Sequence, residues 1–172
     1  DQIKKIVKLL KTDPDSRRML VSAWDESDLR IMLLPPCHDS FQLYTFELDD
    51  LQKEIYGKER GISLIFRMRS TDVPLGLPFN MASYGILLEL FAKVSNMQPF
   101  EIKGYLGDAH IYENQLDGCE TLLKRHDNTD IFPEYPKLNI NAKYDDLGLY
   151  ELSDFDLVGY EPLQHIKFPL SN

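Results

Sequence analysis

The chain has 172 residues, of which 43% are hydrophobic and 27% charged, the balance of an ordinary globular domain with a sizeable core. Its formal net charge of -9 argues against general nucleic-acid binding, because phosphate binding needs an excess of Lys and Arg. The sequence shows no apolar run long enough to span a membrane, no signal peptide and only two cysteines, so we expect a cytoplasmic protein without a disulfide framework.

The chain opens with a helical pattern. Its first apolar residues recur at the spacing of one helix face: Ile3, Ile6, Val7 and Leu10. Asp13-Pro14 is a helix stop signal. Since the pattern is already under way at the first residues, we expect upstream sequence to be absent.

Three strands are predicted next, at residues 19–24, 41–46 and 62–66. The first ends at Trp24, which we expect in the core. The connection at 47–61 is charged and long for a hairpin, and its apolar residues predict a short helix.

Two further helices are predicted. The longer one, at residues 79–96, is the most hydrophobic segment and is expected at the centre of the domain, with a buried stripe of Ala82, Ile86, Leu90 and Val94. The second carries a stripe of Tyr112, Leu116, Cys119 and Leu123. On that stripe Cys119 is interpreted as a packed core thiol.

The remaining chain predicts a proline-bearing loop at 130–136, a strand at 137–141 and an extended segment at 156–166. Strands gathered with helices, without a regular alternation, indicate an α+β architecture in which helices are layered on a mixed β-sheet.

The stretch LPPCH places Cys37 after two prolines, and therefore on a stiff corner outside regular structure. A cysteine attacks as the thiolate, and a free thiol is mostly protonated at neutral pH, so a nucleophilic cysteine needs a nearby cation. The adjacent His38 is a weak partner, because neighbours on an extended segment point to opposite sides. From these residues alone, a small buried side chain and a nucleophile both remain open.

The segment 69–80 crowds polar side chains into a passage from strand to helix: Arg69, Ser70, Thr71, Asp72 and Asn80. A helix N-terminus and a guanidinium facing the same point form an anion site in outline. As a bare pattern, this is only suggestive of a phosphate site.

Five segments in order resemble the C-terminal part of thymidylate synthases: SRRMLVSAW, LPPCHDSFQLY, RSTDVPLGLPFNMASY, GDAHIYEN and DFDLVGYEPLQHIK. The resemblance covers essentially the whole chain apart from 47–61. It implies a thymidylate synthase-like fold, a dimer formed by sheet stacking, and residues 1–172 as the C-terminal portion of a single domain whose N-terminal portion is absent.

The resemblance implies transfer of a one-carbon unit from 5,10-methylenetetrahydrofolate, as co-substrate, to C5 of dUMP, giving dTMP without a metal. Cys37 matches the cysteine that adds to C6 of the uracil ring, which turns C5 into a nucleophile. Arg69 matches the arginine that contacts the phosphate and lies near the thiolate.

Further site residues follow from the same resemblance. The resemblance implies that Asn80 recognises the pyrimidine, because its side-chain amide can donate to O4 and accept from N3–H. Nucleotide contacts are implied for Ser70, Thr71 and Asp72, with Asp72 also near the folate pterin. His110 and Tyr112 match the pair that binds the 3'-hydroxyl of deoxyribose, and their alternation suits one face of a strand.

Two matches concern other parts of the site. Arg17 and Arg18 match a pair of arginines that, in the family, contact the phosphate bound in the active site of the neighbouring subunit. The resemblance also implies that the C-terminal end of the chain contacts the folate, and Ser171 is the residue expected there.

The chain departs from the family pattern near these motifs. Arg67-Met68 replaces a usual Tyr-Gln, Gln115 replaces a histidine, and Leu163-Gln164 replaces His-Pro. The end at Ser171-Asn172 is polar where synthases finish with small and aliphatic residues. In this family, the carbon transferred to C5 is either reduced by hydride, which gives dTMP, or attacked by water, which gives 5-hydroxymethyl-dUMP. Exclusion of water decides between the two, so a hydroxymethylase is one alternative. A non-catalytic fragment that binds nucleotide or dimerises is the other.

Overall fold

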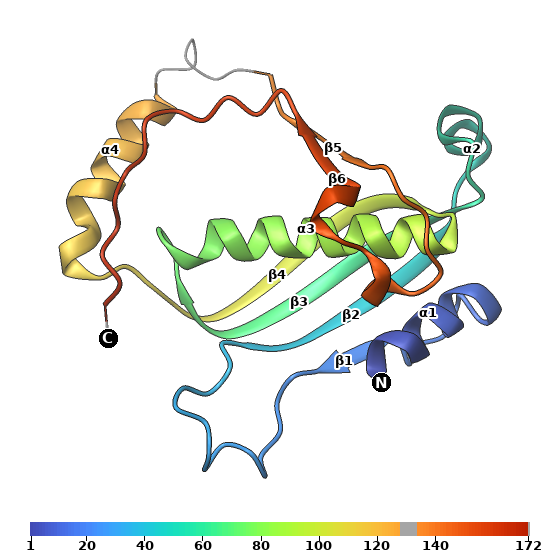
Figure 1. The fold of residues 1–172 in the computed structure, drawn as a ribbon, viewed down its shortest axis with the longest axis horizontal. Helices are drawn as coiled ribbons and strands as arrows, with labels where there is room; N and C mark the ends of the chain where they lie inside the picture. Colours follow the sequence, from blue (N-terminus) through green and yellow to red (C-terminus); the bar gives the residue numbers. More distant parts are fainter. Residues whose placement is uncertain (128–133, 172) are drawn as a thin grey trace.

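A four-stranded mixed sheet forms the centre of the fold in the computed structural model, which describes residues 1–127 and 134–171 (Figure 1). The strands lie side by side in chain order: β1 (Leu20–Ser22), β2 (His38–Glu47), β3 (Arg60–Asp72) and β4 (Gln98–His110). The pairs β1–β2 and β2–β3 are antiparallel, whereas β3 and β4 are parallel and joined by the crossover helix α3 (Gly76–Ser95). The expected α+β fold with a mixed sheet is therefore confirmed.

The remaining elements surround this sheet: α1 (Gln2–Thr12), α2 (Asp50–Tyr56), α4 (Leu116–His126), the hairpin β5 (Lys137–Ile140) and β6 (Phe155–Val158), and the 3-10 turns η1 (Glu113–Gln115), η3 (Leu147–Leu149) and η4 (Leu152–Asp154). After β6 the chain runs back beside α4 to the C-terminus (Figure 1).

Local signals explain the helix boundaries. The carboxylate of Asp1 accepts from the backbone N–H groups of Ile3 and Lys4 and so caps α1, which ends before Pro14 as predicted. The predicted short helix in the 47–61 connection is α2, which begins with a capping box at Asp49 and ends at Gly57 with φ of 62°.

The core lies between α3 and one face of the sheet. Phe91 on α3 and Ile62 and Leu64 on β3 are fully buried there. The predicted stripe on α3 is right for Leu90 and Val94, which are buried, and wrong for Ala82 and Ile86, which are exposed. The helix is apolar on nearly all sides, so its periodicity does not identify the face that meets the sheet.

The opposite face of the sheet carries exposed apolar side chains. Strand register places Tyr44, which is 59% exposed, on the face away from Leu43 and Leu64. The same face carries Leu20, Phe100 and Tyr105, all exposed. We call this surface, defined by Leu20, Tyr44, Phe100 and Tyr105, the open sheet face.

Several predicted elements need correction. β1 is shorter than predicted, β2 and β3 are longer, and most of β4 was not predicted. Trp24 is 39% exposed rather than in the core, and its Nε1 donates to Glu26. No residue of α4 is buried and Cys119 is half-buried, so its interpretation as a packed core thiol is wrong.

The later part of the chain fits its predictions more closely. The strand at 137–141 is β5, whereas only the first part of the extended segment at 156–166 is a strand, within β6. The loop predicted at 130–136 lies outside the described residues except for 134–136, which belong to no helix or strand.

Candidate active site

The corner that carries Cys37 lies immediately before β2, and Arg69 of β3 fixes it. The backbone N–H of Arg69 donates to the Cys37 carbonyl at 2.9 Å. Its guanidinium Nε donates to the Pro36 carbonyl at 3.0 Å, and Nη2 donates to the Pro35 carbonyl at 2.9 Å. Cys37 itself is a half-buried free thiol packed against the core. The structure thus brings together the thiol-bearing corner and the cation that the sequence placed 32 positions later (69 minus 37).

Arg69 does not lie as the sequence pattern suggested. Its Nε and Nη2 are directed at the proline carbonyls, and its guanidinium carbon lies 6.0 Å from the centre of the Trp24 ring. Ser70, Thr71 and Asp72 continue β3, so the segment is strand up to Asp72 rather than a loop. Within residues 1–127 and 134–171, no hydrogen bond joins the Arg69 guanidinium to the first turn of α3, so the joint anion site of the two stays a prediction.

His38 connects β2 to α3 through two hydrogen bonds. Asn80 Nδ2 lies 3.2 Å from His38 Nε2, and His38 Nδ1 lies 3.0 Å from the Tyr84 hydroxyl. An amide nitrogen can only donate, so Nε2 accepts and the proton is on Nδ1, which donates to Tyr84. The second Nδ2 hydrogen of Asn80 and its Oδ1 make no hydrogen bond within residues 1–127 and 134–171.

Tyr84 belongs to this network, although the sequence analysis did not select it. Its ring stacks on Phe66 with centroids 4.3 Å apart, and burial, with a smaller contribution from the Asp39 carboxylate, raises the pKa of its hydroxyl. Tyr84 therefore stays protonated at neutral pH and supports His38. One signal was present in the sequence: Tyr84 follows Asn80 by four residues, one helical turn on the same face.

Asp72 ends β3 with both carboxylate oxygens in hydrogen bonds. Oδ1 accepts from the Leu75 N–H at 3.1 Å, and Oδ2 accepts from Gln115 Nε2 at 2.9 Å. Ser70 is half-buried beside it, while the Thr71 hydroxyl is buried and has no hydrogen-bond partner among the described residues. Asp72 is therefore held in one orientation.

His110 is brought to Asp72 by the pairing of β3 with β4, in which the two residues are register partners. His110 ends β4, whereas Tyr112 lies beyond it, so the prediction that both share a strand face is wrong for Tyr112. Their rings are nonetheless in edge contact, with centroids 5.0 Å apart.

Arg17 and Arg18 lie in the turn between α1 and β1, and both are exposed. Among residues 1–127 and 134–171, no hydrogen bond or ion pair involves either guanidinium. Met19 pairs with Leu43, so the arginines lie beside the middle of β2. The rise of a strand puts that point about 20 Å from Cys37. The structure does not bring them to the site of their own chain.

The end of the chain reaches the same region. Ser171 Oγ accepts a hydrogen bond from Asn114 Nδ2 at 2.8 Å, and the Ser171 hydroxyl donates to Asn114 Oδ1 at 3.0 Å. Ser171 therefore lies next to the Gln115 that contacts Asp72. Sequence reasoning noted Gln115 only as a departure and did not select Asn114.

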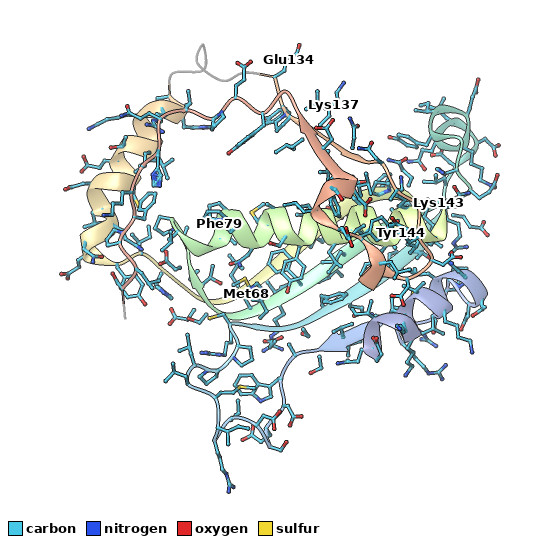
Figure 2. The ribbon with its side chains drawn as sticks, viewed as in Figure 1. Met68, Phe79, Glu134, Lys137, Lys143 and Tyr144 are labelled. Atoms are coloured by element: carbon cyan, nitrogen blue, oxygen red, sulfur yellow. The ribbon has the colours of Figure 1, made fainter. Side chains whose placement is uncertain are left out.

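Beside Arg69, on the side of the open sheet face, lies a cavity of about 460 Å³. It is lined by Leu20, Ser22, Trp24, Asp39, Ser40, Arg67 and Arg69. Arg67 Nε and Asp39 Oδ2 form an ion pair across it at 3.2 Å. Figure 2 labels Met68, which lies between Arg67 and Arg69 in the sequence and is buried in the core, at the end of the sheet near the first turns of α3.

The described residues contain neither a membrane-spanning helix nor a cluster of metal ligands. None of their helices is long and apolar enough to cross a bilayer. Within 1–127 and 134–171, no three His, Cys, Asp or Glu side chains gather as a metal site would require.

Comparison with known proteins places the chain in a family and shows its similarity to a relative. The thymidylate synthase family model matches residues 1–172. A thymidylate synthase of Saccharomyces cerevisiae is 38% identical in an alignment of 172 residues. The alignment covers 99% of this chain and 54% of the yeast protein. The chain thus spans about half the length of this curated relative. With a match to the family model along its whole length, the chain belongs to the thymidylate synthase family.

Proposed function

We propose that this chain carries the nucleotide-binding and nucleophilic half of a thymidylate synthase, which methylates dUMP to dTMP. The observation that supports this most strongly is the corner at Cys37, fixed by three donations from Arg69 and close to the Asn80 and His38 pair. That residues 1–172 form the C-terminal portion of a single domain, and that the protein is cytoplasmic, stay predictions.

The proposed first step is addition of the Cys37 thiolate to C6 of uracil. The S–C6 bond forms, the C5–C6 π electrons move toward C4 and O4, and C5 becomes nucleophilic as part of an enolate. Asn80 has an Nδ2 hydrogen to donate to O4, where this charge develops, and an Oδ1 to accept from N3–H, because neither is hydrogen-bonded to another described residue. Methylenetetrahydrofolate, when bound, supplies the one-carbon unit and the hydride that reduces it.

The other residues orient the nucleotide. We assign Ser70 and Thr71 to nucleotide contacts, His110 and Tyr112 to the 3'-hydroxyl of deoxyribose, and Asp72 to the nucleotide and the folate pterin. Asp72 suits the pterin because Leu75 and Gln115 fix its carboxylate. Ser171 is assigned to the folate side, where the end of the chain approaches Asp72.

Arg17 and Arg18 are assigned to the phosphate in the neighbouring subunit of a homodimer. Both are exposed, lie about 20 Å along β2 from Cys37, and make no hydrogen bond or ion pair through their guanidinium groups with the part of their own chain that the structure describes. The open sheet face offers the apolar surface on which two sheets could stack, because its side chains are exposed although they lie on a sheet. The dimer and its shared sites are part of the proposal.

The test is product identification with the full-length protein that contains this chain, dUMP and methylenetetrahydrofolate. A synthase yields dTMP and dihydrofolate in equal amounts. Release of 5-hydroxymethyl-dUMP without dihydrofolate would favour the hydroxymethylase. Saturable dUMP binding without any product would favour the non-catalytic alternative.

Asn80→Asp is expected to reduce discrimination in favour of uracil over cytosine. The amide can donate to O4 and accept from N3–H, whereas a carboxylate has no donor for O4. We expect kcat/KM for dUMP to fall about 10- to 100-fold, the effect of one or two mismatched buried hydrogen bonds, with dCMP binding gaining relative to dUMP. Steady-state kinetics and competition by dCMP provide the measurement. Unchanged preference for dUMP would contradict the role of Asn80.

Tyr44→Glu is expected to weaken self-association. A carboxylate in the middle of the open sheet face would be buried if two sheets stack there, at a cost of several kcal/mol per interface. Sedimentation equilibrium should show dimer for the parent protein and monomer for the variant. Leu51→Glu is the matched control, because Leu51 is similarly exposed, at 66%, but lies on α2. Equal dimerisation of both variants would refute stacking through this face.

A further inference from the structure

Gln115 connects three parts of the molecule through one buried side chain, which is 1% exposed. Its Nε2 donates to Asp72 Oδ2 at 2.9 Å and to the Pro169 carbonyl at 3.2 Å. Its Oε1 accepts from the Tyr112 N–H at 3.1 Å. Both amide hydrogens and the amide oxygen are therefore used.

Few side chains can make this set of bonds. A neutral histidine offers one donor and one acceptor, and a carboxylate offers no donor. Only an amide of this length donates twice while accepting once. Gln115 thus joins the end of β3, the turn after β4 and the C-terminal segment at a single point.

The C-terminal segment is docked by neighbours of Gln115 as well. Asn114 exchanges two hydrogen bonds with Ser171, at 2.8 and 3.0 Å. Gly118 lies so close to Phe168 that a Cβ on it would be 2.5 Å from the ring, so the absence of a side chain lets the ring approach. Residues 168–171 are therefore held by the short stretch 114–118.

The Asp72 carboxylate receives two hydrogen bonds from the described residues, and one of them depends on this docking. The Leu75 N–H fixes Oδ1 within the β3–α3 connection. Gln115 fixes Oδ2, and its own position depends on Pro169 and Tyr112. Release of the C-terminal segment would remove a partner of the amide that orients Asp72.

We infer that Gln115 is a positioning residue that couples docking of the C-terminal segment to the orientation of Asp72. The inference rests on the proposed function only where it concerns the folate, because that function assigns Asp72 to the pterin. Because coupling is reciprocal, Asp72 also stabilises the docked segment. This second consequence can be measured without any catalytic activity.

The first measurement is amide hydrogen exchange of residues 163–171 in the full-length protein. Gln115→Met keeps the length of the side chain and removes its hydrogen bonds. We expect exchange to be about tenfold faster in Gln115→Met, and faster also in Asp72→Ala, which removes the partner of the amide. Gln98→Met is the matched control, because the Gln98 side chain makes one hydrogen bond among the described residues, to the Pro99 carbonyl, and its loss should leave the exchange unchanged.

The second measurement compares the change in KM for methylenetetrahydrofolate with the change in Kd for dUMP. Gln115→Met should raise KM for methylenetetrahydrofolate about tenfold while Kd for dUMP changes by less than about twofold, because the nucleotide keeps its proposed contacts with Ser70, Thr71, Asn80 and His110. Asn114→Ala loosens Ser171 without touching Asp72, so it should raise that KM less than Gln115→Met does.

Three outcomes would overturn the inference. Exchange in Asp72→Ala at the parent rate would show that the coupling does not exist. An equal rise in folate KM and dUMP Kd in Gln115→Met would show a general structural role. An unchanged folate KM in a folded variant would remove the link to the pterin. If the parent protein has no turnover, the proposed function fails, while the exchange result still decides the coupling.

Discussion

Cys37→Ala is expected to abolish turnover of dUMP, lowering kcat by about 10⁴-fold or more, the loss typical of removing a covalent nucleophile. Uracil C5 is too electron-poor to attack the one-carbon unit without prior addition at C6, and no other thiol lies at the corner fixed by Arg69 in the described chain. Dihydrofolate formation, followed by its absorbance, measures the effect.

The control for this prediction is Cys119→Ala. Cys119 is the second free thiol, half-buried on α4, and it is expected to leave kcat within about twofold of the parent value because surface changes away from a site cost little. Retention of more than about 1% of activity in Cys37→Ala would contradict a covalent role, as would loss of activity in Cys119→Ala with normal folding.

Arg69→Ala is the change with the next largest expected effect. It removes the two guanidinium bonds to Pro35 and Pro36 that fix the corner, and it removes the cation near the thiol. Each charged hydrogen bond contributes about 1.5 to 3 kcal/mol, so we expect the rate of dUMP turnover to fall at least about 100-fold. Binding of dUMP should weaken as well, because the remaining guanidinium nitrogen, Nη1, makes no hydrogen bond to the described residues and is the one that we propose for the phosphate.

Two neighbouring substitutions sharpen this result. Arg69→Lys keeps the charge but lacks the planar fork that reaches two carbonyls, so it should recover only part of the loss. Arg67→Ala removes a guanidinium two positions away that pairs with Asp39 and does not contact the corner, and it should cost less than about fivefold. Similar losses in Arg67→Ala and Arg69→Ala would refute the specific role of Arg69, provided circular dichroism shows both variants folded.

The parts of the fold predicted correctly are those with strong local signals. α1 and α2 have capping residues and stop signals in the sequence. β4 was largely missed because it is an edge strand with charged and glycine residues, such as Glu101, Lys103 and Gly107, at exposed positions. Its strand conformation comes from pairing with β3, which a local pattern does not reveal.

The candidate site shows the same limit. The motif around Cys37 and the residues Arg69 and Asn80 were found from the sequence through their resemblance to the family. The direction of Arg69 was not, because its guanidinium partners lie 33 and 34 positions away in the chain. Gln115 meets Asp72 across 43 positions and Pro169 across 54, so its role emerges only when the strands are paired.

The central claim is that the Cys37 sulfur forms a bond to the uracil ring. The most direct measurement is mass spectrometry of the full-length protein after incubation with 5-fluoro-dUMP and methylenetetrahydrofolate, since fluorine at C5 prevents completion of the cycle and leaves the adduct in place. We expect a covalent adduct of both molecules on the peptide that contains Cys37. An unmodified protein, or an adduct on the peptide that contains Cys119, would contradict it.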